Sequence, residues 1–492
     1  MTTGPTGARK TLSRWIANDY GTRQFNWLQR YEMMKSNSLV TMDLATSLHP
    51  STDARALEKT GPLIMDRGEG IYVYDTDGKQ YIEALSGLWS VALGFSEKRL
   101  AEAATKQMER LPFYHIFFSK SHEPSIRLSD KLIEMAADAR LSRVFYTNSG
   151  SEANDTVIKL VWYMNNALGR PKKKKFLARQ KAYHGITIGA GSLTGLPANH
   201  KDFDLPAIPV IHLTCPHYYG FAKSGETEVE FTHRLLVEAE ETILREGPET
   251  IAAFIGEPVM GGGGVFPPPE GYWLGIEALC RKYDILLVAD EVITGFGRLG
   301  TTFAFKKYGF SPDIVTVSKQ ITSSYMPLGA VLFGEAIYNP VADNSHKIGT
   351  FAHGYTASAH PVVTAVALEN LKIIEERDLI GNAARLETPF QNGLRQLAEL
   401  PFVGDVRGVG LLAALELVAD KKSKRPFSAP GRVGSMAMQI AHDEGLILRA
   451  IGDTLALCPP LIVTEDQVRE IIERVRRIIT LTIERIPALG VA

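Results

Sequence analysis

The segment from Tyr283 to Gln320 constrains the fold more than any other part of the chain. It contains five consecutive apolar residues, Ile285–Ala289, followed directly by Asp290. An apolar run without alternation predicts a strand that is buried on both faces. A second β-rich run, Ile314–Val317, leads to Lys319. We therefore expect Asp290 and Lys319 at the carboxyl ends of sheet strands, where open α/β sheets bind their ligands.

Short β-rich runs alternate with helical patterns through the middle of the chain. Besides the two strands above, the expected strands are Val144–Thr147, Lys175–Ala178, Val210–Leu213, Ile251–Ile255 and Ala330–Phe333. The expected helices are Glu97–Glu109 with Ser96 as its cap, Ser125–Ala136, Ser151–Asn165, Glu230–Arg245 and Gly271–Lys282. This alternation predicts an α/β fold with a mostly parallel sheet and helices on both faces.

The pattern differs at the two ends of the chain. Asp77-Gly78 predicts a hairpin turn between two β-rich runs, and Trp27–Met34 could form an amphipathic helix. After His360-Pro361, two helices, Pro361–Arg377 and Leu379–Leu400, lead to a strand at Gly410–Leu417 and a terminal helix from Glu465. We expect a smaller α+β domain at 351–492, a large domain at 76–350, and an N-terminal segment at 1–75 that contributes to the small domain.

Composition excludes several functional classes. The 492 residues carry a formal net charge of −1, which gives no overall attraction to nucleic acid or to an anionic membrane. The basic run Lys172–Lys175 is expected to be a solvated turn. Three scattered cysteines, with no CxxC pair, indicate neither a disulfide framework nor a metal site, and favour a reducing compartment. No apolar run reaches membrane-spanning length.

The N-terminus leaves the compartment open. Arg9, Lys10 and Arg14 precede the first acidic residue, Asp19, which resembles a mitochondrial presequence weakly. Helix-like sequence follows directly, so we expect a cytoplasmic protein, with import into mitochondria as the alternative.

Two segments have the residues needed to hold a phosphate group. Thr147–Asp155 follows a strand and opens a helix, so backbone N–H groups near Gly150 and Ser151 can face an anion, although such loops also serve simply as helix caps. Thr356 lies in a small polar turn at the domain junction. The glycine run Gly261–Gly264 lacks the Gly-Lys-Ser/Thr of a nucleotide loop, so close backbone approach explains it better.

Two further side chains end strands and can bind a substrate or cofactor. Tyr183 lies just past a strand, where an aromatic ring can stack on a flat ligand, or simply line the core. Arg449 ends a strand and can bind a carboxylate bidentately, or form an ordinary surface ion pair.

Together these residues supply an amine nucleophile, a carboxylate, a stacking ring and two phosphate-binding segments in one sheet. That set fits pyridoxal phosphate, with Lys319 bonded to it as a Schiff base and Asp290 keeping its ring nitrogen protonated. Neither a nicotinamide site nor a flavin site requires the lysine.

The chain resembles the class III pyridoxal-phosphate aminotransferases of fold type I, and within them the ω-amine:pyruvate and GABA:pyruvate group. The resemblance extends from about residue 60 to 485. It is carried by Asp290–Arg298 with Ser318-Lys319, Gly87–Trp89, Leu111–His115, Ser149–Asp155, Cys215–Tyr218 and Glu257–Gly261. It implies a large domain with a mostly parallel seven-stranded sheet and a smaller α+β domain.

The resemblance also implies a role for each matching residue. Lys319 would bond the cofactor and carry the proton, and Asp290 would pair with the ring nitrogen. Cofactor contacts would come from Gly150, Ser151, Tyr183, Glu257, Val292 and Thr356, with Thr356 donated by the neighbouring subunit of a homodimer. Substrate contacts would come from Arg449, Tyr183, Trp89, and Phe117 or Phe118. Departures from the family pattern at Gln320, Ser324, Ala357 and Ala359 leave the shape of the pocket open.

The expected activity is a ping-pong transamination from a primary amine or an ω-amino acid to pyruvate, which becomes alanine. An aminomutase or a decarboxylating relative would keep Lys319 and Asp290 as well. A non-catalytic protein with the same fold is the alternative of a different class, and the intact Lys319 argues against it. The physiological amine cannot be deduced from the sequence.

Overall fold

The computed structural model describes residues 38–491, which form two compact units. One unit comprises the chain up to Asp66 together with Asp75–Gly78, and the other comprises Arg67–Tyr74 and Lys79 onward. The helix expected at Trp27–Met34 and the basic N-terminal stretch lie outside the described residues. The expected boundaries at residues 75 and 350 remain a prediction.

The first unit contains two short helices, α3 (Leu39–Thr46) and α4 (Ala54–Thr60). The carboxylate of Asp53 caps α4 by accepting hydrogen bonds from the backbone N–H groups of Arg55 and Ala56. Strand β1 (Met65–Glu69) spans the boundary between the units.

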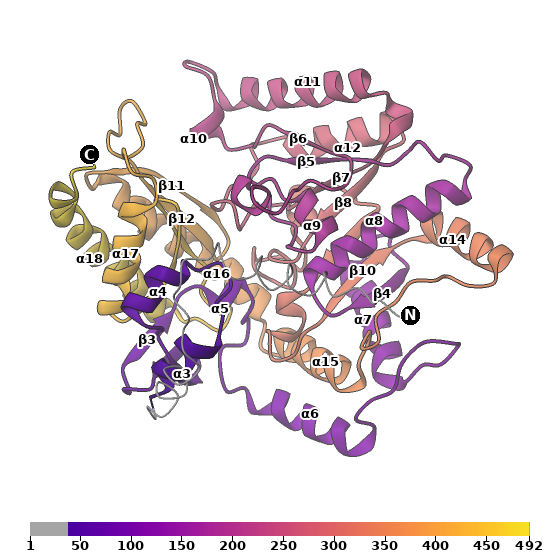
Figure 1. Ribbon diagram of the computed structural model, residues 1–492, viewed down its shortest axis with the longest axis horizontal. Helices are drawn as coiled ribbons and strands as arrows, with labels where there is room; N and C mark the ends of the chain where they lie inside the picture. The colour runs from indigo at the N-terminus through magenta and orange to yellow at the C-terminus, as the bar shows by residue number, and fades with distance from the viewer. Residues whose placement is uncertain (1–37, 492) are drawn as a thin grey trace, which may run out of the picture. The chain divides into compact units, whose positions relative to one another are not determined.

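The second unit is built on a seven-stranded sheet with the order β4-β10-β9-β8-β7-β5-β6 (Figure 1). Its strands are β4 (Arg143–Thr147), β5 (Lys175–Arg179), β6 (Val210–Leu213), β7 (Ile251–Gly256), β8 (Leu286–Asp290), β9 (Ile314–Val317) and β10 (Gly329–Phe333). β5 to β9 pair in parallel, and only β10 runs antiparallel to its neighbours β4 and β9. The expected mostly parallel seven-stranded sheet is confirmed.

Helices cover both faces of this sheet. Alternate side chains of β8 point to opposite faces: Val288 packs with residues of α8 (Gly150–Ala167) and α14 (Glu335–Ile348). Leu287 packs instead with residues of α7 (Glu123–Ala136) and α12 (Tyr272–Lys282). α11 (Glu228–Glu246) lies against α12 (Figure 1). Shorter helical segments on this part of the chain are α5 (Ser86–Trp89), α9 (Ile188–Leu193), α10 (Tyr218–Phe221), α13 (Ala304–Tyr308) and the 3-10 turn η3 (Lys319–Thr322).

The C-terminal part of the second unit has a four-stranded antiparallel sheet with the order β11-β12-β15-β14. Its strands are β11 (Val403–Val409), β12 (Leu412–Leu417), β14 (Arg449–Ile451) and β15 (Thr454–Leu457). β13 (Leu446–Ile447) pairs in parallel with β3 (Gln80–Glu83), which forms the expected hairpin with β2 (Tyr72–Asp75). The helices of this part are α15 (Pro361–Glu376), α16 (Leu379–Arg395), α17 (Arg432–Asp443) and α18 (Glu465–Leu489), and α6 (Lys98–Arg110) packs on α15.

The structure changes two local expectations. The strand expected to start at Gly410 starts at Leu412, because Gly410 has φ +57° and forms the turn between β11 and β12. Ser96 does not cap α6: its φ is +62° and its hydroxyl donates to the carbonyl of Gly68. The cap is Glu97, whose carboxylate accepts from the backbone N–H of Arg99.

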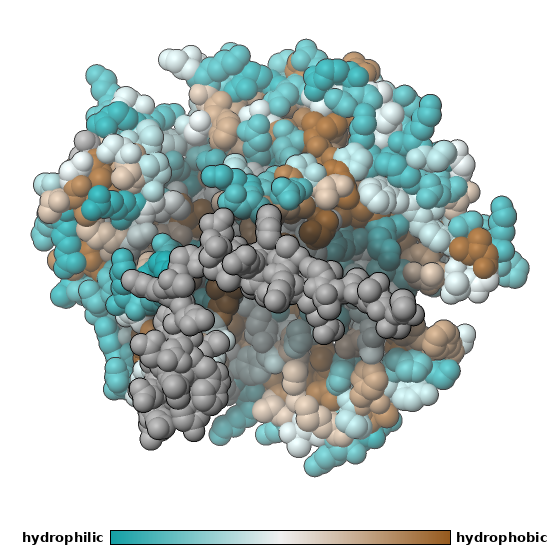
Figure 2. All heavy atoms as spheres, viewed as in Figure 1, coloured by the Kyte–Doolittle hydropathy of each residue, from teal (hydrophilic) through white to brown (hydrophobic). Residues whose placement is uncertain are grey.

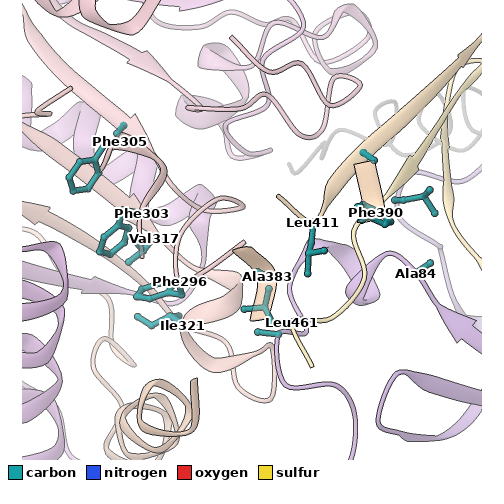
Figure 3. Packing of buried hydrophobic residues seen from close by; sticks show 14 of the residues in the cluster. Ala84, Phe296, Phe303, Phe305, Val317, Ile321, Ala383, Phe390, Leu411 and Leu461 are labelled. Carbon is teal, nitrogen blue, oxygen red and sulfur yellow. The ribbon is translucent and has the colours of Figure 1, made fainter. Parts of the chain in front are cut away.

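One apolar cluster joins the seven-stranded sheet to the four-stranded antiparallel sheet of the C-terminal part. Figure 3 shows it continuing from Phe303 and Phe296 beneath the large sheet, past Leu461, to Leu411 and Phe390 of the C-terminal part. The face drawn in Figure 2 is mainly hydrophilic, with hydrophobic residues in separate patches. Within residues 38–491, no helix is long and apolar enough to cross a membrane.

The basic run Lys172–Lys175 leads from the turn after α8 into β5, as expected, but it is only partly solvated, because the Lys173 side chain is 8% exposed. Lys173 pairs with Asp284 at 3.3 Å, Lys175 pairs with Glu246 at 2.9 Å, and Lys174 donates to the carbonyl of Trp162. These cations hold a turn between α8 and β5 in place.

Candidate active site

Asp290 and Lys319 lie at the carboxyl ends of two neighbouring parallel strands. Asp290 is the last residue of β8 and pairs in register with Thr316 of β9. Lys319 begins η3, just past the end of β9, with φ +49°. A non-glycine residue at positive φ is strained, and such strain is concentrated at functional sites.

Three hydrogen bonds hold the Asp290 carboxylate, which is only 3% exposed. Its Oδ2 lies 2.8 Å from the Nδ2 of Asn154 and 2.8 Å from the Nδ1 of His184. Its Oδ1 accepts from the backbone N–H of Val292 at 3.1 Å. With Oδ2 held by two donors, Oδ1 retains acceptor capacity for one more N–H group.

Two amide side chains brace the strained turn at Lys319. The Nδ2 of Asn370 on α15 donates to the carbonyls of Gln320 and Ile321, at 2.8 and 3.0 Å. The Nε2 of Gln320 donates to the carbonyls of Ile293 and Gly295, at 2.8 and 3.0 Å. Gln320, one of the departures from the family pattern, therefore ties the lysine turn to the segment that follows Asp290.

The Lys319 amine is buried, and it forms no ion pair with Asp290 among the described residues. Burial lowers the pKa of Lys319, while the nearby charges of Asp290 and Glu257 act to raise it. Within the described residues no ion pair joins Lys319 to Asp290, whose oxygens bind Asn154, His184 and Val292. A lysine with a lowered pKa has a larger neutral, nucleophilic fraction.

Glu257 fixes the segment that carries Tyr183. One carboxylate oxygen of Glu257 accepts from the backbone N–H of Tyr183 and the other from that of Gly261, both at 2.9 Å. Burial raises the pKa of Glu257. The contacts shown for Glu257 are thus to the backbone, and its direct contact with a cofactor remains a prediction.

Gly150 and Ser151 form the first turn of α8, next to Val292. The hydroxyl of Ser149 caps the helix by accepting from the backbone N–H of Glu152 at 3.2 Å. A Cβ on Gly150 would lie 3.1 Å from both γ-methyl groups of Val292, so only glycine fits there comfortably. This places the N–H groups at the start of an 18-residue helix beside the residue that follows Asp290 and Glu291.

Arg449 does not end a strand as expected: β13 stops at Ile447, and Arg449 begins β14, which pairs with β15 at the edge of the C-terminal sheet. Its guanidinium is half-buried, and burial lowers the pKa of Arg449 while Tyr183 acts to raise it. Its positive charge also acts to lower the pKa of Lys319. No carboxylate of residues 38–491 forms an ion pair with Arg449, so the guanidinium is free to take an anionic ligand.

Trp89 is a buried residue on a strained turn. Ser86, Gly87 and Trp89 all have positive φ. The indole Nε1 is buried and has no hydrogen-bond partner among the described residues. The carboxylate of Glu83 accepts from the backbone N–H of Leu85 at 2.8 Å and so stabilises the entry to this turn.

Thr356, Phe117 and Phe118 form a separate, more exposed group. Phe117 packs on Gly354 in the turn that carries Thr356, because a Cβ on Gly354 would lie 2.7 Å from its ring. Thr356 is exposed, and Phe118 is 83% exposed. The structure therefore brings Asp290, Lys319, Tyr183, Val292, Gly150 and Arg449 together. It leaves Thr356 and Phe118 exposed and Phe117 half-buried.

Sequence reasoning assigned no role to Asn154 or His184, the two side chains that hold Asp290. Asn154 also donates to the carbonyl of His184 at 2.7 Å, which links α8, the segment after β5 and the end of β8. The available signal was spacing: Asn154 lies four residues after Gly150, on the same face of α8.

Pyridoxal 5'-phosphate fits the donors and acceptors of this site. Lys319 offers an amine without an ion-pair partner, Asp290 offers remaining acceptor capacity on Oδ1, and the N-terminus of α8 offers N–H groups to a phosphate. When bound, the cofactor supplies a pyridinium ring that withdraws electrons from the amine-bearing carbon of a substrate. The fold and this donor set define a pyridoxal-phosphate enzyme of fold type I.

Comparison with known families agrees. The sequence profile of the family described as "Aminotransferase class-III" matches residues 54–479. The chain belongs to the class-III aminotransferases, and is therefore an enzyme that transfers amino groups with pyridoxal 5'-phosphate as its cofactor.

The chain is also similar over most of its length to individual relatives and solved structures. The chain is 51% identical over 428 residues to a protein from Oryza sativa subsp. indica named "Probable gamma-aminobutyrate transaminase 3, mitochondrial", covering 87% of this chain and 84% of that protein. It is 50% identical over 411 residues to a tomato (Solanum lycopersicum) protein named "Gamma aminobutyrate transaminase 3, chloroplastic", covering 84% and 79%. The ω-transaminase of Pseudomonas jessenii, solved in complex with PMP, superposes with a TM-score of 0.90 at 55% identity, covering 92% of this chain and 99% of that one. A PMP-bound aminotransferase from Vibrio fluvialis gives a TM-score of 0.89 at 42% identity, covering 91% and 99%.

Proposed function

We propose that this aminotransferase moves an amino group from a primary amine or an ω-amino acid to pyruvate in two half-reactions, releasing alanine in the second. The observation that carries this proposal is the free guanidinium of Arg449 beside Tyr183 and within electrostatic reach of Lys319. It offers a bidentate partner to the carboxylate of a keto acid. The relatives named as γ-aminobutyrate transaminases and ω-transaminases support the choice of amine.

In the proposed mechanism Lys319 would hold the cofactor and would move a proton at the amine-bearing carbon of the substrate. Its lowered pKa favours the neutral amine that both tasks require. Asp290 would hold the ring nitrogen of the cofactor, and the hydrogen bonds from Asn154 and His184 fix the orientation of its carboxylate.

The remaining site residues position the two ligands. Tyr183 and Val292 would hold the cofactor ring between them, while Gly150 and Ser151 would bind its phosphate through the start of α8. Arg449 binds the carboxylate of the keto acid and is not required for a plain amine. Gly150, whose Cβ would crowd Val292, keeps the phosphate-binding turn and the ring-packing residue in contact.

Trp89 and Phe117 or Phe118 form walls of the substrate pocket in this proposal. A solved variant of a thermostable ω-transaminase, changed at a tryptophan, a phenylalanine and an arginine, was engineered for the asymmetric synthesis of enantiopure bulky amines. Trp89, Phe117 and Arg449 are the same three residue types in the pocket proposed for this chain.

The pocket is completed by a second copy of the chain in a homodimer. Thr356 and Phe118 are exposed in a single chain, and Ile186 and Ile188, just past Tyr183, are 69% and 63% exposed. Exposed hydrophobic residues next to an active site are typical of a protein interface. Thr356 of one subunit would bind the phosphate held by the other, and sedimentation of the purified protein tests the assembly.

A cytoplasmic location is part of the proposal. The three cysteines are all buried and unpaired, which is typical of a reducing compartment. Several relatives are named as mitochondrial, so fluorescence of the full-length chain fused to a reporter must show diffuse rather than organellar signal.

A spectroscopic experiment tests the proposed chemistry. The purified protein is expected to be yellow, to bleach when a primary amine is added, and to regain its colour with pyruvate. Lys319→Ala should lose turnover completely, whereas Lys282→Ala, which removes a surface ion pair with Glu240 and a contact with the Tyr283 ring, should retain it. A Lys319→Ala variant with normal turnover would falsify the role of Lys319.

Acceptor and product analysis separates the alternatives. A panel of amines with pyruvate, 2-oxoglutarate and glyoxylate should show pyruvate as the preferred acceptor. Release of carbon dioxide, or an isomerised amine without keto-acid consumption, would instead identify a decarboxylating or aminomutase relative.

A further inference from the structure

We propose that Arg407 is a positioning residue of this enzyme: from β11 it clamps the Gly261–Gly264 loop behind Tyr183 and so sets how tightly the cofactor ring is held. The inference rests on the proposed placement of the cofactor against Tyr183. It assigns a role to Arg407 and to Gly262–Gly264, which have no part in the site described above.

Arg407 grips the end of the loop with two of its nitrogens. Its Nε donates to the carbonyls of Gly264 and Val265, at 3.1 and 2.9 Å, and its Nη2 donates to Gly264 at 2.8 Å. The guanidinium also lies over the ring of Phe266, 4.7 Å from its centroid. The side chain is only 9% exposed, so these bonds to carbonyls are shielded from water.

The third nitrogen anchors the clamp to the C-terminal sheet. Nη1 lies 2.8 Å from Oδ2 of Asp405 and 2.7 Å from Oε2 of Glu416, on adjacent strands β11 and β12. His217 stacks on Phe266, and its Nε2 lies 3.8 and 3.9 Å from the same two oxygens. His217, Asp405 and Glu416 resemble a metal-ligand set, but the guanidinium already occupies the position between the two carboxylates. Arg407 therefore supplies the positive charge that neutralises Asp405 and Glu416, and no metal ion is needed.

The loop transmits this constraint to Tyr183 through backbone contacts. A Cβ on Gly262 would lie 3.0 Å from the Cβ of Tyr183, and one on Gly263 would lie 2.1 Å from the carbonyl oxygen of Lys181. Glu257 ties the N–H of Gly261 to the N–H of Tyr183 through its two carboxylate oxygens. The glycines therefore permit direct contact between the loop and the Tyr183 segment, and no phosphate is needed to explain them.

Arg407 thus links the C-terminal sheet to the loop behind Tyr183. If its side chain is removed, the loop can move away from Tyr183, and the Tyr183 ring loses its support. Cofactor affinity should fall, while Lys319 and Asp290, which are held by other contacts, keep their positions.

The experiment measures cofactor affinity in variants of the full chain. Holoenzyme is dialysed free of pyridoxal phosphate and titrated with it, following absorbance. Arg407→Met removes the clamp, and Arg407→Met with Asp405→Asn removes it at unchanged net charge of the cluster. Arg474→Met is the matched control, because Arg474 also donates to two carbonyls, of Glu444 and Gly445, and pairs with Glu470, but on α18. If Arg407→Met does not fold, the charge-matched double variant and Arg407→Lys provide the measurement.

We expect both Arg407→Met variants to bind pyridoxal phosphate at least about tenfold more weakly, the size of effect that follows loss of a charged hydrogen bond. Arg474→Met should bind it as the unaltered enzyme does. Because Arg407 acts through Tyr183, adding Arg407→Met to Tyr183→Ala should cause no further weakening. Independent, additive losses, or unchanged affinity in the folded Arg407 variants, would overturn the positioning role.

The same titration separates this inference from the proposed function. If Tyr183→Ala binds the cofactor normally, the placement of the cofactor against Tyr183 is wrong. If Tyr183→Ala weakens binding and the Arg407 variants do not, the placement stands and only the role of Arg407 fails.

Discussion

The Nδ1 of His184 lies 2.8 Å from Oδ2 of Asp290, with the ring only 2% exposed and its Nε2 without a partner among the described residues. Because a carboxylate only accepts hydrogen bonds, this pairing places the proton of a neutral ring on Nδ1. His184 therefore donates its hydrogen bond to Oδ2 and fixes the orientation of the carboxylate, which leaves Oδ1 to accept from the cofactor.

His184→Ala should slow the first half-reaction by about 10- to 100-fold, since a hydrogen bond to a charged group contributes about 1.5–3 kcal/mol. Single-turnover bleaching with a primary amine measures the effect. His200→Ala is the control, because the His200 ring bonds only to the carbonyl of Gly191 among its described partners. An unchanged bleaching rate in His184→Ala would show that Asn154 and Val292 suffice to orient Asp290.

Arg449→Leu should raise the KM for pyruvate by about 100-fold, the value of a bidentate charged contact, and leave bleaching by an amine without a carboxylate nearly unchanged. The two half-reactions are measured separately by absorbance. Arg449→Lys should restore part of the affinity for pyruvate, because lysine keeps the positive charge but cannot bind a carboxylate through two N–H groups. Equal losses in both half-reactions would show instead that the substitution damages the fold of β14.

Replacing Lys319 by Met should stabilise the cofactor-free protein at neutral pH. Burial lowers the folded-state pKa of Lys319 below its ordinary value of 10.5, so between these two pKa values the unfolded chain binds more protons than the folded one. The free energy of unfolding of the unaltered protein therefore rises with pH in that window, and the advantage of the Met variant shrinks as pH approaches 10.5. Urea unfolding of both proteins from pH 7 upward checks this, and a constant difference would contradict it.

Glu291, next to Asp290, gives a pH dependence of the opposite sign. Burial raises the pKa of Glu291 from 4.5 to about 7, so its contribution to stability is full below 4.5 and is lost as pH rises to about 7. The loss should approach about 3 kcal/mol, at 1.36 kcal/mol for each unit of pKa. Glu291→Gln should lack this slope in urea unfolding between pH 4.5 and 7, and parallel profiles would show that Glu291 is not buried as a protonated acid.

Strands with strong apolar patterns were predictable from the sequence, and one polar strand was not. Ile314–Val317 has the same bounds in the sequence and in the structure, because all four residues are buried. β11 was missed because most of Val403–Val409 is only partly buried and includes Gly404, Asp405, Arg407 and Gly408. It becomes a strand through pairing with β12, which is a tertiary effect.

The reactive residues of the site were predictable, because an acid or a lysine is rare at the end of a buried strand. The hydrogen bonds that hold these residues in place were not predictable. An acid and a lysine after buried strands indicated Asp290 and Lys319. The bonds from Asn154, His184 and Asn370 depend on side chains that three separate elements bring together, and no sequence period encodes them. The positive φ of Lys319 was equally hidden, because the sequence there contains no glycine.

Arg449 lies on a three-residue strand at the sheet edge, whereas Asp290 ends a central strand of the other sheet. Residues on such an edge can vary without disturbing the ladder that carries the lysine and the acid. Natural divergence or laboratory selection can therefore alter which amines and keto acids are accepted while the catalytic apparatus stays intact. A randomised library confined to β14, whose three residues are only partly buried, should retain many folded, cofactor-loaded members, and one at the end of β8 should retain few.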